Sequence, residues 1–222
     1  MCCAAMSGEI KIMNFNINKL IAELSNRRKL FVSEADFQLE LAWLIKELYP
    51  SAVVRMEYSP KFDTNMHIDI LVIIEDKWIP IELKYKTKGC QKLVDGEFYQ
   101  LKNHSAKDVN CYAYLKDIQR IERIKKNVPA FQEGYTVLIT NELSYTKTPM
   151  SKAVNYYAFS IHEGAIKRGT IDWGEGTGKG TKGRNYKDPI VLNGEYVMKW
   201  STYSMVDSSN TGAFMVLINR VL

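Results

Sequence analysis

Three charged residues interrupt two apolar runs in the stretch H-I-D-I-L-V-I-I-E-D-K-W-I-P-I-E-L-K-Y-K, which covers residues 67–86. Asp69 lies in the first run, and Glu82 and Lys84 lie in the second. Burying an unpaired charge among Ile, Val and Leu costs several kcal/mol, so a strand that only fills a core has no use for them. Two neighbouring carboxylates repel each other unless a cation lies between them, and their oxygens suit Mg²⁺ or Mn²⁺. The stretch therefore indicates a metal site formed by Asp69 and Glu82.

The spacing of the two runs predicts a β-hairpin that brings the three charges onto one face. Side chains alternate between the faces of a strand, so Glu82 and Lys84 must share a face. A two-residue loop at Asp76 and Lys77 places Asp69 opposite Lys84, and a four-residue loop preserves the same register. A loop with an odd number of residues would move Asp69 to the other face. The cluster therefore depends on the turn.

Phosphodiester hydrolysis is the chemistry that this cluster would support. A divalent ion held by Asp69 and Glu82 would polarise the phosphodiester and lower the pKa of a bound water. Lys84 would orient or help to activate the nucleophile and would stabilise developing charge. The alternative is a cross-strand ion-pair cluster, which contributes little when exposed and is costly when buried.

A helix upstream of the hairpin supplies a further acid. Ser33 is a suitable N-cap for a helix that ends before Pro50. Its apolar positions follow helical spacing: Phe37, Leu41, Leu44, Ile45 and Leu48. Glu34 falls within the arc of these apolar residues, so we expect it to point toward the sheet and the active site. The alternative is a first-turn acid that complements the helix dipole, worth about 0.3–1 kcal/mol.

The other elements are predicted from periodicity and turn residues. Residues 16–25 favour a short helix, residues 53–58 a strand and residues 87–97 a loop. Helical pattern returns near residue 98 and dominates residues 106–126, and residues 134–141 form a buried strand. Because its charges have mixed sign, we interpret the charged side of the long helix as a solvated face. These charges are Lys116, Asp117, Arg120, Glu122, Arg123, Lys125 and Lys126.

The last third of the chain changes character. Residues 169–183 are glycine-rich and are interpreted as a mobile, basic connection, because they do not match a phosphate-binding loop. The stretches 195–206 and 213–222 are predicted to be two further strands. We expect one domain over 1–222, with residues 1–15 disordered.

This order of elements resembles the PD-(D/E)XK superfamily of metal-dependent nucleases, also called restriction-endonuclease-like. Asp69 matches the first motif acid, Glu82 the second, Lys84 the lysine, and Glu34 the acid that many members carry on their first core helix. Ile68 stands where the motif proline is usual. The resemblance covers about 30–142. It implies an α/β fold with an αβββαβ core, a mixed central sheet flanked by helices, and it leaves about 143–222 as a β-rich C-terminal elaboration.

The resemblance also implies roles for these residues and for two others. Asp69 and Glu82 would bind Mg²⁺ or Mn²⁺, Lys84 would be the catalytic lysine, and Glu34 an auxiliary acid. Gln100 and Lys102 precede the long helix, where a Gln or basic residue in this superfamily often supports the site or touches a phosphate. A solvated helix start is the alternative for both.

Composition limits the classes of function. With 46% hydrophobic and 25% charged residues, the chain is unlike disordered proteins. No run approaches the ~20 apolar residues that cross a bilayer, so we expect a cytoplasmic protein without a membrane partner. The four cysteines and three histidines lack zinc-ligand spacing. A net charge of +5 is compatible with nucleic acid, and DNA is the expected substrate.

Three points of function stay open from the sequence. A catalytically silent nucleic-acid-binding or protein-interaction module on the same fold would use the same elements. An accessory subunit that needs a partner protein is a third reading. A homodimer is compatible with each of them.

Overall fold

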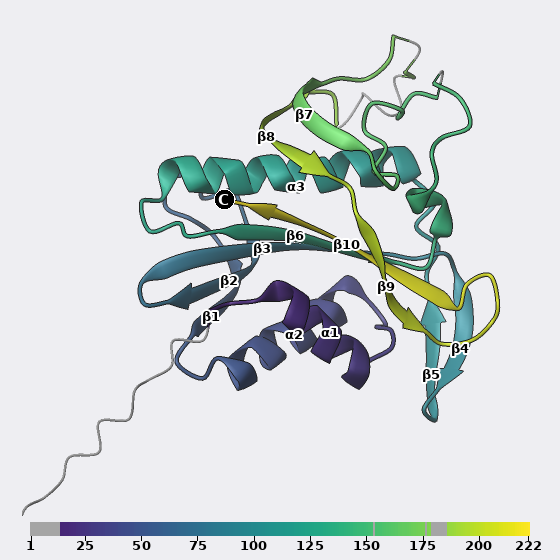
Figure 1. Cartoon of the computed structure of the whole chain (residues 1–222), viewed down its shortest axis with the longest axis horizontal. Coiled ribbons are helices and arrows are strands. Elements are labelled where there is room, and N and C mark those ends of the chain that lie inside the picture. Colours follow the sequence, from purple (N-terminus) through teal and green to yellow (C-terminus); the bar gives the residue numbers. More distant parts are fainter. Residues whose placement is uncertain (1–13, 153, 176, 179–185) are drawn as a thin grey trace, which may run out of the picture.

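A mixed sheet with helices on both faces forms the centre of the protein in the computed structural model, which describes residues 14–152, 154–175, 177–178 and 186–222. Figure 1 shows α1 (Ile17–Arg27) and α2 (Glu34–Leu48) below the sheet and α3 (Lys107–Asn127) above it. The expected α/β class, with a mixed central sheet flanked by helices, is confirmed.

The central sheet has six strands in the order β1-β2-β3-β6-β10-β9. The strands are β1 (Val53–Tyr58), β2 (Ile68–Ile74), β3 (Lys77–Lys86), β4 (Cys90–Val94), β5 (Glu97–Leu101), β6 (Gly134–Thr140), β7 (Ile166–Ile171), β8 (Ile190–Val197), β9 (Trp200–Met205) and β10 (Ala213–Val221), and a short 3-10 helix, η1 (Leu143–Thr146), follows β6. β3 and β6 are parallel, and the other neighbours in this sheet are antiparallel. The apolar run of β6 is buried along its whole length, as expected for a central strand covered on both faces.

The hairpin between β2 and β3 forms with a different turn from the predicted one. Glu75 and Asp76 are the loop residues, with positive φ angles of 49° and 62°, as a two-residue loop of type I′ requires. Ile74 therefore faces Lys77, and the register continues to Ile70 opposite Ile81. The predicted loop at residues 76–77 is wrong by one position. Because the register moves by an even number of residues, the charges keep their common face.

The predicted cap of α2 is confirmed. The Ser33 hydroxyl accepts the backbone N–H of Asp36 at 3.1 Å, and Glu34 is the first residue of the helix. Phe37, Leu41 and other apolar side chains of α2 enter a core against the sheet. This packing fixes the direction in which Glu34 points.

Four predicted segments differ from the structure. Residues 87–97 are not a loop, because β4 and β5 pair as a hairpin that projects from one end of the sheet in Figure 1. The helical region predicted from residue 98 accordingly begins only at Lys107. The stretch 195–206 contains the end of β8 and then β9, and part of the glycine-rich segment, Gly169–Ile171, belongs to β7. Residues 176 and 179–185 lie outside the described residues.

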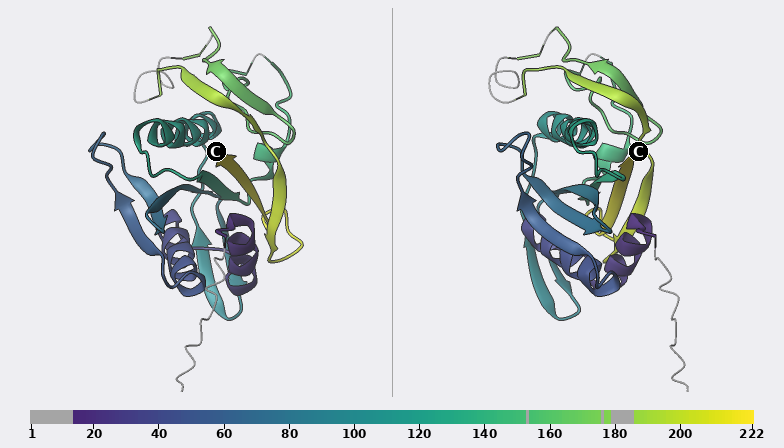
Figure 2. Two further views of the ribbon diagram at one scale, coloured as in Figure 1. Left: turned by 60° about the vertical axis from the view of Figure 1, so that its left-hand side comes forward. Right: turned by 90° about the vertical axis from the view of Figure 1, so that its left-hand side faces the viewer.

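α3 lies between the sheet and a second layer made by β7 and β8 (Figure 2). Tyr112 of α3 packs against Phe159 and Trp173, with ring centroids 5.2 and 5.5 Å away. Glu122 contacts β8 and is 8% exposed, whereas Asp117 faces β3 on the other side of the helix and is 4% exposed. The interpretation of the charged residues as a solvated helix face is wrong for these two, because sequence-distant strands cover the helix.

Residues 1–13 of the segment predicted to be disordered lie outside the described residues. Phe15 is described, and it is buried against Tyr49 and Tyr135, with ring centroids 5.3 and 6.0 Å away, so the prediction is wrong there. Among the described residues, no helix is long and apolar enough to cross a membrane.

Candidate active site

Asp69 and Glu82 lie where β2 and β3 stop pairing. The ladder ends at Ile70 and Ile81, and the next position in this register places Asp69 opposite Glu82. Asp69 Oδ2 accepts the backbone N–H of Leu83 at 2.6 Å, in place of a further ladder bond. The structure thus brings the two predicted ligand carboxylates together, with Glu82 rather than Lys84 opposite Asp69.

Strand alternation decides which layer the charged residues face. Leu83 and Tyr85 enter the core on the α1 and α2 side of the sheet. Glu82 and Lys84 alternate with them and therefore point toward α3. The site consequently lies between β3 and α3.

Two residues of α3 complete the cluster, and the sequence analysis had not assigned them to it. Lys84 Nζ lies 2.7 Å from Asp117 Oδ2. Arg120 lies between the acids, with Nη1 3.3 Å from Asp117 Oδ1 and Nη2 3.2 Å from Glu82 Oε1. Asp117 sits three residues after Tyr114 and four before Ile121, both buried, so it interrupts an apolar stripe of the helix. That interruption is the sequence signal that could have identified it.

Glu82 is a buried carboxylate without hydrogen bonds. Among the described residues, neither of its oxygens has a hydrogen-bond partner, and the ion pair with Arg120 is its one close charge contact. Burial raises its pKa well above the usual range, repulsion from Asp117 and Asp69 raises it further, and Arg120 opposes the shift. An acid in this state gains most from a bound cation.

The pKa values of Asp69 and Lys84 are shifted in ways that suit different roles for the two side chains. Burial raises the pKa of Asp69 to about 6, against the opposing effect of Lys84. Burial alone would lower the pKa of Lys84, but Asp117 and Asp69 raise it above its ordinary value. Lys84 is therefore a charged hydrogen-bond donor at neutral pH, suited to stabilising negative charge rather than to accepting a proton.

Glu34 points toward the sheet, as predicted. Its Oε2 accepts the backbone N–H of Tyr85 and the Lys86 ammonium, each at 2.8 Å. One turn along α2, Gln38 Nε2 donates to the backbone carbonyl of Asp69 at 2.6 Å. The first turns of α2 thus hold both strands of the hairpin, and Glu34 pairs with Lys86 rather than Lys84.

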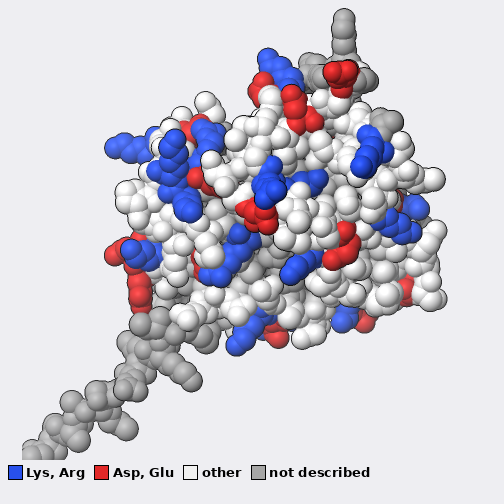
Figure 3. All heavy atoms as spheres, turned by 45° about the horizontal axis from the view of Figure 1, so that its top comes forward, with Lys and Arg blue, Asp and Glu red and all other residues white. Residues whose placement is uncertain are grey.

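A pocket of about 390 Å³ opens on Asp69. Lys116, Arg120 and Arg123 of α3 line it, and Arg123 also pairs with Asp63 at 2.8 Å. Figure 3 shows Lys and Arg side chains, with acids among them, over the C-terminal half of α3. The pocket therefore brings three cations of α3 to the side of Asp69.

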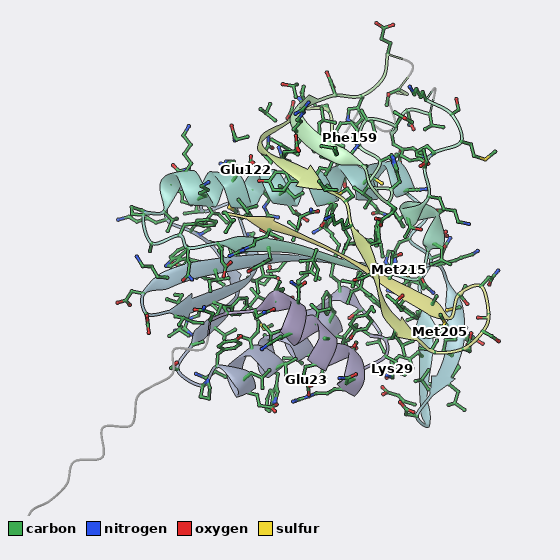
Figure 4. All side chains as sticks on the ribbon, in the orientation of Figure 1. Glu23, Lys29, Glu122, Phe159, Met205 and Met215 are labelled. Carbon is green, nitrogen blue, oxygen red and sulfur yellow. The ribbon has the colours of Figure 1, made fainter. Side chains whose placement is uncertain are left out.

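A larger hollow of about 900 Å³ lies between α3 and β8, and its buried acid has a structural role. Glu122, beside β8 in Figure 4, accepts the backbone N–H groups of Asn193 and Gly194 and the Tyr196 hydroxyl, at 2.7 to 3.0 Å. Its carboxylate is fully engaged in holding β8 to the helix. We therefore place the candidate site at the smaller pocket.

Gln100 and Lys102 lie on the β4–β5 side of the molecule. Gln100 is exposed on β5 opposite Gln91, and Lys102 is exposed just after it. The backbone carbonyl of Lys102 accepts the Thr87 hydroxyl at 2.6 Å. Among the contacts of the described residues, none joins either side chain to the acids at the β2–β3 junction. Their expected role in substrate binding stays a prediction.

The side chains at this site suit a metal ion that takes two carboxylates as its protein ligands. Within the described ranges, no group of three or more His, Cys, Asp or Glu side chains is arranged to bind a metal. Mg²⁺ commonly uses one or two carboxylates with water and substrate oxygens, and the unpartnered Glu82 opposite Asp69 offers that pair. The residues present therefore fit a hard divalent ion that keeps several waters.

No family model, curated protein or solved structure matches the chain. The case for a function consequently rests on the arrangement of these residues and on general chemistry.

Proposed function

We propose that this protein is a Mg²⁺-dependent nuclease that hydrolyses phosphodiester bonds of DNA. The observation that carries the proposal is Glu82, buried without a hydrogen-bond partner opposite Asp69 and beside the charged Lys84. A buried carboxylate without a hydrogen bond is destabilising, so Glu82 next to Asp69, which lines a basic pocket, is best explained by a ligand.

The roles of the residues follow from their positions. Asp69 and Glu82 would hold Mg²⁺ or Mn²⁺, which when bound supplies Lewis-acid polarisation and a water of lowered pKa. Lys84 would donate to the negative charge that develops on the phosphate. Asp117 acts through Lys84, because its carboxylate fixes the ammonium at 2.7 Å. Glu34 would support the end of β3 that carries the lysine.

The order α2-β1-β2-β3-α3-β6 supports a restriction-endonuclease-like core. It follows the αβββαβ pattern of the PD-(D/E)XK superfamily, with β3 parallel to β6 and the acids on consecutive strands. The β4–β5 hairpin, the β7–β8 pair and the strands β9 and β10 are additions to that pattern. A core of this kind, elaborated at its C-terminal end, is part of the proposal.

A catalytically silent module is the second candidate, and one observation favours it. Lys84 and Arg120 already lie among Asp69, Glu82 and Asp117, so the cluster is partly neutralised without a metal. A buried ion-pair network of this kind can persist after catalysis is lost.

Cleavage assays separate the two candidates. Purified protein is incubated with supercoiled plasmid and with linear DNA in Mg²⁺, in Mn²⁺ and in EDTA, beside Asp69→Asn and the surface variant Arg27→Gln. We expect cleavage by the wild type and Arg27→Gln with metal alone, and none by Asp69→Asn. Activity that survives EDTA contradicts the proposal, and a folded protein that cleaves neither the plasmid nor the linear DNA supports the silent module.

A further inference from the structure

Arg120 belongs to two environments at once. Its guanidinium contacts Glu82, Asp117 and the backbone carbonyl of His67, and it also forms part of the wall of the pocket over Asp69. The side chain is 23% exposed, so the pocket reaches it while most of it stays covered. A cation in this position can contact both the acids and anything that enters the pocket.

Two other cations lie on the same face of α3. Lys116, Arg120 and Arg123 follow the spacing i, i+4, i+7, which places them in one row along the helix. The Lys116 ammonium donates to Gln119 at 2.8 Å, and Arg123 is half exposed beside Asp63. Arg120, in the middle of the row, is the member that contacts the buried acids.

We propose that Lys116, Arg120 and Arg123 form the binding site for the backbone phosphate of a DNA strand, and that Arg120 moves from Glu82 to this phosphate when metal binds. This inference rests on the proposed function and names the residues that recognise its substrate.

Electrostatic repulsion between the metal ion and the Arg120 guanidinium would drive the exchange. Without a metal, Arg120 is the one cation in contact with Glu82 among the described residues. A divalent ion between Asp69 and Glu82 would bring two further positive charges next to the guanidinium in a buried site, where like charges interact strongly. A phosphate offers the guanidinium a bidentate partner of matching geometry.

The exchange couples two binding events. Metal and phosphate each favour the position of Arg120 that the other requires, so each should strengthen the binding of the other. In the metal-free protein Arg120 competes with the metal for Glu82. Removing the guanidinium should therefore weaken DNA binding and strengthen metal binding, whereas a purely structural residue would weaken both.

Two binding measurements test the inference. The affinity for a 20-base-pair DNA duplex with cleavage-resistant phosphorothioate linkages is measured by fluorescence anisotropy at several salt concentrations, in EDTA and in saturating Mn²⁺. Mn²⁺ binding is measured by calorimetry without DNA. For Arg120→Gln in Mn²⁺ we expect a loss of duplex affinity of about tenfold, and a slope of log affinity against log salt concentration that is smaller by about one. In EDTA, where Arg120 stays on Glu82, we expect a much smaller loss. Without DNA, Arg120→Gln should bind Mn²⁺ more tightly than the wild type does.

Further variants keep the test decisive if Arg120→Gln does not fold. Arg120→Lys keeps the charge and should lose less duplex affinity, and Arg123→Gln should weaken the duplex but leave Mn²⁺ binding unchanged. Arg27→Gln removes one positive charge from an exposed ion pair on α1, across the sheet, and should change neither.

The outcomes distinguish this inference from the proposed function. Wild-type duplex affinity of Arg120→Gln in Mn²⁺, or equal Mn²⁺ affinity in Arg120→Gln and the wild type, overturns the exchange and leaves the nuclease proposal intact. Failure of Mn²⁺ to bind any of these proteins overturns the metal site itself, and the exchange with it.

Discussion

Replacing Asp69 by Asn should stabilise the protein while it removes the metal site. Burial raises the pKa of Asp69 from 3.8 to about 6, so the folded state holds this proton more tightly than the unfolded state does. Ionising the carboxylate in the folded protein therefore costs up to about 3 kcal/mol. An Asn side chain cannot ionise, and its oxygen can still accept the N–H of Leu83.

The direction of this pKa shift predicts how the stability of the wild type changes with pH. Because the folded-state pKa is raised, the stability of the wild type falls as pH increases from about 4 to about 6, and the loss is complete above that range. We expect Asp69→Asn to exceed the wild type by up to about 3 kcal/mol at pH 7.5 and to match it near pH 4. Saturating Mg²⁺ should narrow the gap at pH 7.5, since it would bind only the wild type.

Urea unfolding between pH 4 and 8, followed by tryptophan fluorescence in EDTA, measures this difference. Asp207→Asn is a matched control of opposite sign, because a hydrogen bond from Lys92 lowers the pKa of Asp207 to about 2. Its stabilisation is present above the unfolded pKa, so the control should be less stable than the wild type by a constant amount from pH 5 to 8. A less stable Asp69→Asn at pH 7.5, or a difference that does not vary with pH, would refute the reasoning.

Three further substitutions test other parts of the structure. Lys84→Ala should abolish metal-dependent plasmid cleavage, while circular dichroism shows a folded protein; cleavage at the wild-type rate would exclude its catalytic role. Glu34→Gln should lower the free energy of unfolding by less than about 1 kcal/mol, because its ion pair with Lys86 is partly exposed. The rate of cleavage should fall by more than this small loss of stability would cause. Glu122→Ala removes the acceptor that holds β8 to α3 and should cost about 3 kcal/mol or more, with faster amide exchange in β8; unchanged exchange would contradict this assignment.

Strand alternation was the most reliable guide from sequence to site. Asp69, Glu82 and Lys84 share a face in any hairpin whose loop has an even number of residues. They were therefore grouped correctly even though the predicted loop was wrong by one position. The turn itself was not fixed by composition, because Asp76 suits either loop. The structure uses Glu75 and Asp76, both with positive φ, and this choice places Glu82 rather than Lys84 opposite Asp69.

Local pattern could have marked Asp117, which interrupts the apolar stripe of α3, but it could not give the partners of the α3 acids. Mixed charges on a helix usually indicate solvent, and Asp117 and Glu122 are buried only because β3 and β8 cover opposite sides of the helix. β8 lies about seventy residues further along the chain than these acids. The same applies to the place of β10, which joins the central sheet beside β6 through non-local pairing and brings β9 with it.

The central claim is that Asp69 and Glu82 bind a divalent metal ion, and a crystal grown or soaked with Mn²⁺ tests it most directly. Anomalous scattering locates Mn²⁺ independently of the protein model. We predict a peak between the two carboxylates, with Lys84 nearby and the Arg120 guanidinium withdrawn from Glu82. A crystal saturated with Mn²⁺ that shows no peak there, and in which Arg120 still contacts Glu82, would contradict the claim.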